Sequence, residues 1–121
     1  VSDKSKLANK KRIKPADLIN EKFILPRRNN IKNELSSWLG TDITKLNIVA
    51  AHNLNSNSAV MVSKGLGTSL CIETDMIKYF PGIKVIPLEP ELSARTVVAW
   101  KKNIPMNTAT EKFMEFLVSW K

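Results

Sequence analysis

The fold is decided by residues 23–40, which read FILPRRNNIKNELSSWLG. The stretch opens with four apolar residues, Phe23 to Pro26, whose length and composition are typical of a buried strand. A polar loop follows, and the next apolar residues are spaced as on one face of a helix: Ile31, Leu35, Trp38 and Leu39. Asn30 is a favourable N-cap for this helix, and Gly40 is a favourable residue just after its end. The stretch therefore predicts a strand, a loop and a helix in succession.

The same alternation continues on both sides of this stretch. Further strands are expected at Leu46–Ala51, Thr68–Ile72, Ile83–Leu88 and Arg95–Lys101. Helices are expected at Pro15–Asn20, Ala59–Lys64 and Asp75–Phe80, and a last one follows the capping-box spacing Thr108…Glu111. Apolar strands that alternate with capped helices indicate βαβ units. We therefore predict an α/β fold with a mainly parallel sheet flanked by helices.

The composition limits the class of protein. The chain has 121 residues, of which 43% are hydrophobic and 25% charged, as in an ordinary globular domain or a part of one. No run approaches the roughly 18 apolar residues of a membrane span. The single cysteine, Cys71, excludes an intramolecular disulfide and argues against a cysteine-based zinc cluster. Because the chain opens at Val1 rather than at a methionine, we expect a fragment of a longer protein.

The net charge is strongly positive, since 19 Lys and Arg stand against 11 Asp and Glu, a formal charge of +8. A basic domain can meet nucleic acid, a membrane surface or an acidic metabolite. Six of the basic residues crowd the first fourteen positions: Lys4, Lys6, Lys10, Lys11, Arg12 and Lys14. The others are scattered among acidic residues, which favours a solvated amino-terminal face. Direct binding of nucleic acid stays open as an alternative.

No set of residues predicts catalysis. His52 is the only histidine, and Cys71 lies within an expected strand, where burial would make its thiol inert. Gly65-Leu66-Gly67 follows a helix and lacks the Lys-Ser/Thr of a P-loop, so we interpret it as a helix end and a turn. We expect no enzyme, no metal and no cofactor.

Two polar loops follow expected strands and precede helices: Arg27–Asn30 and His52–Ser58. In open α/β sheets, ligands bind at the carboxyl ends of the strands. A helix N-terminus offers unpaired N–H groups and a positive dipole end to an anion. The two loops therefore predict the wall of a pocket for a small polar or anionic ligand. The alternative is that these polar residues only cap their helices, and capping and binding can coexist.

Three passages, in this order, resemble a known family. Lys6-Leu7-Ala8 with Ile13–Leu18 is similar to the passage through which that family's chain enters the second lobe of its effector-binding domain. Ser58–Leu70 is similar to the helix, glycine turn and strand that follow in the same lobe. Val97–Asn103, Pro105 and the last helix are similar to the returning strand and closing helix. The family is that of the LysR-type transcriptional regulators. The chain departs from its pattern at Cys71, where a proline is usual, and at Lys4-Ser5-Lys6, which replaces a common histidine-proline.

The resemblance implies a periplasmic-binding-protein-like fold of type 2, with two α/β lobes and an effector between them. Residues 1–94 would form the second lobe with its entering connector, and residues 95–121 the returning hinge strand and C-terminal helix. The DNA-binding domain and most of the first lobe would be absent, so the protein would contact DNA only through a winged helix-turn-helix outside this chain. A regulator of this kind is cytoplasmic, binds no membrane and forms homo-oligomers.

The resemblance and the two loops together predict a regulatory domain that binds a small metabolite to modulate transcription. Anions are among the candidate effectors. The expected contacts are Pro26, Arg27, Arg28, His52, Asn53, Asn55 and Ser56. Two other functions stay open: a lobe of a solute-binding protein for transport, and a basic nucleic-acid-binding module. We also expect self-association through the apolar face of the last helix.

Overall fold

The computed structural model describes the backbone of residues 1–94 and 97–120, and their side chains except those of residues 29 and 30. Its sheet has three parallel strands in the order β2-β1-β3: β1 (Lys22–Pro26), β2 (Asn47–His52) and β3 (Thr68–Ser69). The most apolar strand is central, and its Phe23, Ile24 and Leu25 are fully buried. The parallel α/β class predicted from the sequence is confirmed.

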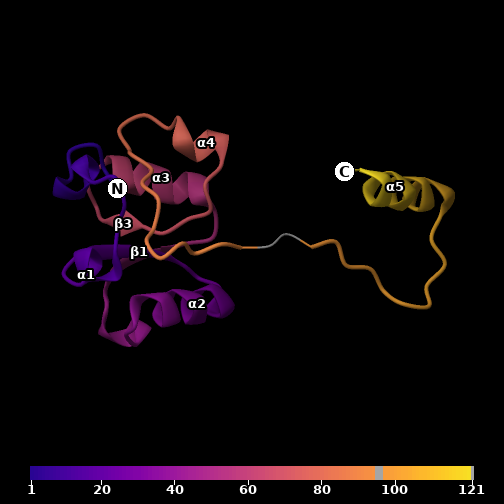
Figure 1. Ribbon diagram of the computed structural model, residues 1–121, viewed down its shortest axis with the longest axis horizontal. Helices are drawn as coiled ribbons and strands as arrows, with labels where there is room; N and C mark the ends of the chain where they lie inside the picture. Colours follow the sequence, from indigo (N-terminus) through magenta and orange to yellow (C-terminus); the bar gives the residue numbers. More distant parts are fainter. Residues whose placement is uncertain (95–96, 121) are drawn as a thin grey trace.

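Helices cover both faces of the sheet (Figure 1). α1 (Pro15–Leu18) and α2 (Asn29–Leu39) lie on one side, and α3 (Asn55–Ser63) and α4 (Asp75–Lys78) on the other. Two 3-10 turns, η1 (Lys6–Asn9) and η2 (Ile43–Lys45), complete the body. Because side chains alternate along a strand, Phe23 and Leu25 enter one apolar cluster with Leu7, Ile13, Leu18 and Leu35. Ile24 faces the opposite layer, under α3.

Three helix N-termini differ from the expected ones, and in the last helix the N-cap is Asn107 rather than the Thr108 of the predicted capping box. α2 begins at Asn29 with Arg28 at its N-cap, so Asn30 lies inside the helix. α3 begins at Asn55 rather than Ala59, because the polar tract forms its first turn. The C-terminal end of α2 is as predicted: Gly40 has a φ of 66°, and its N–H bonds to the carbonyls of the preceding turn.

Two expected strands are corrected. β3 stops at Ser69, and residues 70–72 do not pair. Residues 83–88 form only isolated bridges, because each end of the segment has a different partner: Ser2 pairs antiparallel with Ile83, and Ile13 parallel with Leu88. The segment is thus held by the amino-terminal residues instead of joining the sheet.

The strand expected at Arg95–Lys101 falls partly outside the described residues, because residues 95 and 96 are not described. Residues 97–101 form no strand. Val97 and Trp100 are 78% and 60% exposed, so this apolar stretch does not pack against the described sheet. Its assignment to a returning hinge strand stays a prediction.

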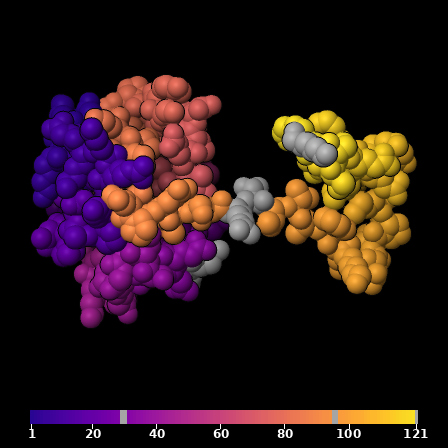
Figure 2. Space-filling model, viewed as in Figure 1, coloured from indigo at the N-terminus to yellow at the C-terminus, as the bar shows by residue number. Residues whose placement is uncertain are grey.

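The last helix, α5 (Thr108–Ser119), stands apart from the body at the end of an extended segment (Figures 1 and 2). Its N-cap is Asn107, whose Oδ1 accepts a hydrogen bond of 2.8 Å from the Thr110 N–H. The predicted apolar stripe forms, and the rings of Phe116 and Trp120 stack at 5.9 Å. No residue of α5 is buried. The stripe is therefore an apolar surface that the described part of the chain leaves uncovered.

Candidate functional site

The two polar loops lie side by side at the carboxyl edge of the sheet. β1 and β2 are neighbours, and Pro26 is in register with His52. Directly beyond this pair, the Arg27 N–H donates to the His52 carbonyl at 2.9 Å. The two strands therefore end at the same level, and each leads into the first turn of a helix.

The seven predicted site residues differ in exposure. Pro26 and His52 are buried at the strand ends. Arg27, Arg28 and Asn53 are exposed, while Asn55 and Ser56 are half-buried in the first turn of α3. The seven residues thus offer two guanidinium groups, two amides and one hydroxyl, and all of them lie at the ends of β1 and β2 or in the loops that follow.

Among the described side chains, none caps either helix that starts at this edge. The N-cap positions belong to Arg28, which has no acceptor atom, and to Leu54, which has no polar side chain. Ser58 does not compensate, because its hydroxyl donates to the Asn55 carbonyl at 2.8 Å. The idea that the polar residues of these loops serve as N-caps is wrong for α2 and α3. Their first-turn N–H groups have no acceptor on the N-cap side chain and point to an anion as a suitable partner.

His52 sits beneath this edge and is only 5% exposed. Its Nδ1 lies 3.1 Å from the Leu54 carbonyl, which can only accept, so Nδ1 carries the proton. Burial lowers the pKa of His52, and the bond to Leu54 partly opposes that shift. The ring is therefore neutral at pH 7, and the positive charge of the edge comes from the arginines. Leu54 was missed by sequence reasoning, because its contact is made by the backbone carbonyl and no side-chain pattern signals it.

The order of strands, helices and loops can now be compared with known proteins. The family model of the LysR substrate binding domain matches residues 1–121. The chain belongs to the LysR substrate-binding domain family. No curated protein and no solved structure matches it.

The membership confirms the resemblance and the periplasmic-binding-protein-like α/β fold. This LysR domain is accordingly an effector-sensing regulatory domain of a transcription regulator. Domains of this family serve regulators and are generally not enzymes. None of the described helices is both long and apolar enough to span a membrane.

Other chemistry-bearing groups of the LysR domain lie away from this edge. Within residues 1–94 and 97–120, no group of three or more His, Cys, Asp or Glu could hold a metal ion. Cys71 is a free and exposed thiol, contrary to the expectation of burial, because β3 ends two residues before it. Partial burial of its sulfur and the nearby charge of Glu73 raise its pKa. The thiol is therefore protonated and a poor nucleophile at neutral pH.

Proposed function

We propose that this LysR domain senses a small anionic metabolite at the carboxyl edge of β1 and β2. The observation that carries the proposal is that two helices begin beside the hydrogen bond from Arg27 to His52, and that neither Arg28 nor Leu54, at their N-cap positions, makes a capping hydrogen bond with its side chain. Each helix adds N–H groups and a positive dipole end at this edge, and these favour a carboxylate or a phosphate.

The side chains at the edge add charge and direction. Arg27 and Arg28 can bind a carboxylate with paired, charge-assisted hydrogen bonds. Asn53, Asn55 and Ser56 offer neutral donors and acceptors that distinguish one anion from another. Pro26 and His52 lie beneath them and support the floor of the site.

Binding would regulate by differential affinity. In the proposed arrangement, residues 1–94 are the second lobe, and residues 95–121 return through the hinge toward a first lobe. An effector that contacts both lobes favours the arrangement in which both contacts are made, and it shifts the parent regulator toward that state. Homo-oligomers of the parent would carry this shift to the bound DNA.

The amino-terminal basic residues give little support to direct nucleic-acid binding. Three of them pair with acids of the body: Lys6 with Glu21 at 3.4 Å, Lys10 with Asp17 at 2.8 Å and Lys14 with Glu89 at 3.8 Å. A phosphate-binding face needs cations that are free to displace counterions. These pairs therefore favour a structural use of the amino-terminal charge.

The test is an NMR titration of the 121-residue chain with inorganic phosphate and with citrate at low salt. We expect saturable amide shifts in residues 27–31 and 53–57. Replacing both Arg27 and Arg28 with Gln should weaken binding at least about 100-fold, since each charged hydrogen bond contributes about 1.5–3 kcal/mol and at least two are lost, while the N–H groups remain.

The matched control is Lys11→Gln, which removes a positive charge far from the edge and should leave the affinity unchanged. Uniform shifts at basic residues across the surface, or equal affinity of the double variant, would refute the site. Duplex DNA at two salt concentrations tests the nucleic-acid alternative, which requires binding that weakens steeply with salt.

A further inference from the structure

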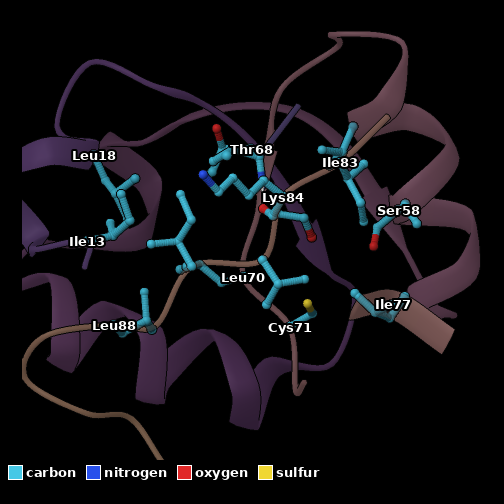
Figure 3. A pocket seen from close by; sticks show the side chains of 16 residues that line it. Ile13, Leu18, Ser58, Thr68, Leu70, Cys71, Ile77, Ile83, Lys84 and Leu88 are labelled. Carbon is cyan, nitrogen blue, oxygen red and sulfur yellow. Dashed lines mark hydrogen bonds between the residues drawn. The ribbon is translucent and has the colours of Figure 1, made fainter. Parts of the chain in front are cut away.

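A cavity lies between β3, α3 and the segment 83–88 (Figure 3). Its volume is about 80 Å³. Aliphatic side chains from five parts of the chain form most of the wall, among them Leu18, Ala59, Val62, Leu70, Ile77 and Ile83. Ser58, the last residue of the loop His52–Ser58, is the one lining residue that it shares with the two loops, and none of the seven predicted site residues lines it.

The early end of β3 explains why this space is open. Leu70 and Cys71 leave the sheet without pairing, while the facing segment 83–88 is bridged to Ser2 and Ile13 instead. The side chains of the two segments therefore line a space between them rather than interdigitate (Figure 3). Protein interiors are normally packed as densely as organic crystals, so a void of this size has lost contacts that an occupant would restore.

One polar group of the wall has no partner. The Ser69 Oγ is buried and makes no hydrogen bond to any described residue. The other two hydroxyls that line the cavity are engaged: Thr68 donates to Glu21 at 3.4 Å, and Ser58 donates to the Asn55 carbonyl at 2.8 Å. An occupant with a single polar group would therefore find one matching partner among these hydroxyls, at Ser69.

We propose that this cavity binds a small neutral aliphatic molecule with one hydroxyl or carbonyl group, which bonds to the Ser69 Oγ. A dry cavity of about 150 Å³ accepts benzene, so about half that volume suits a body of about three carbon atoms. The occupant is neutral because neither cation of the wall is a free buried partner: Lys84 is exposed, and the Val1 ammonium, whose pKa burial lowers, already donates to the Lys84 carbonyl at 3.1 Å. A carboxylate inside would therefore lose its water without gaining a buried positive charge.

The site is separate from the effector edge, although both use α3. Asn55 and Ser56 at the start of α3 belong to the edge, while Ser58, Ala59 and Val62 of the same helix line the cavity. An occupant would add contacts to α3 and to residues 83–86, and it would hold them together.

The test is an NMR titration of the 121-residue chain with 1-propanol, followed at the methyl groups of Leu18, Ile77 and Ile83. We expect saturable shifts at these methyls and none at the amides of residues 27–31. Glycerol has the same number of carbon atoms but three hydroxyls, so it should give no such shifts at equal concentration. Equal shifts with glycerol, or none with 1-propanol, would overturn the proposal.

Two variants and one further measurement sharpen the result. Ala59→Leu fills the cavity and should abolish the shifts, while Ala51→Leu makes the same change at an exposed position of β2 and should leave them intact. If Ala59→Leu does not fold, Ser69→Ala decides: about fivefold weaker binding is expected from the loss of one hydrogen bond, and unchanged affinity refutes the assigned contact. Slow hydrogen exchange at residues 70–72 in the free chain would mean that β3 continues, and the cavity would then not exist.

Discussion

Gly67 marks the closest approach between the turn after α3 and the central strand. A Cβ atom at this position would lie 2.6 Å from the Lys22 carbonyl oxygen, 3.2 Å from its carbon and 3.3 Å from the Cγ1 of Ile24. The first two atoms belong to the backbone of β1, so they cannot move aside without disturbing the sheet. Gly67→Ala should therefore destabilise the fold.

The magnitude follows from two opposing effects. Overpacking of this kind destabilises the folded state by about 1–3 kcal/mol. Alanine also reduces the conformational freedom of the unfolded chain relative to glycine, which stabilises the folded state by about 0.4–1 kcal/mol. The net loss is about 1–2 kcal/mol. At about 2.1 cal/mol/K per residue, a chain of 121 residues loses about 4 °C of Tm per kcal/mol, so Gly67→Ala should melt about 4–8 °C lower.

The assay is thermal unfolding followed by circular dichroism, with Gly65→Asn as the control. Gly65 belongs to the same turn, a Cβ atom added there would meet no other atom within 4 Å, and its φ of 75° is one that asparagine tolerates. The control should therefore melt within about 2 °C of the wild type. If Gly67→Ala melts no lower than the wild type, the close approach to β1 is not a constraint and the reasoning fails.

Four further outcomes are expected. Gly40→Ala should lower the free energy of unfolding, measured in urea, by about 1 kcal/mol, because the φ of 66° at this position disfavours a residue with a Cβ. Gly40→Asn should lower it by less, because asparagine tolerates this conformation better. The pKa of His52 is lower in the folded chain, so the unfolded chain takes up the proton at a higher pH. The free energy of unfolding should therefore be constant above about pH 6.5 and fall as the pH drops below that value. Urea unfolding midpoints measured between pH 5 and 8 should show this slope in the wild type and not in His52→Gln. Trp38→Phe should cost about 1 kcal/mol, because the Trp38 Nε1–H donates to the Pro90 carbonyl at 2.7 Å, and hydrogen exchange near Pro90 should then accelerate. The exposed stripe of α5 should drive association at high concentration, and Phe116→Ser should shift the mass toward the monomer in light scattering; a monomeric wild type at every concentration would contradict this.

The sequence predicted the features that depend on local patterns. Phe23–Pro26 and the segment around Ile48 are apolar runs of strand length, and both pair in the sheet. Gly40 ends α2 because the left-handed conformation is cheap only for glycine. The shared edge of the two polar loops also followed from parallel strands alone, and the register of Pro26 with His52 bears it out.

The features that failed depend on tertiary partners. Residues 83–88 have the β-branched composition of a strand, but their hydrogen bonds go to Val1 and Ile13, which no local pattern could reveal. α3 begins four residues early, because Asn55 and Ser56 are residues that equally suit a loop. The role of Leu54 depends on the placement of the His52 ring, and sequence spacing does not determine that placement.

The bridge between Ser2 and Ile83 has a consequence for the synthesis of this protein. The ribosome must add about eighty more residues after Ser2 before that contact can form, which takes about 4–16 s at 5–20 residues per second. β1 also waits for Thr68, its partner on the β3 side. During that interval the most apolar strand of the nascent chain is incompletely covered. A chaperone that binds short aliphatic segments should therefore bind the nascent chain at residues 23–26. It should dissociate after residue 83 has emerged from the ribosome.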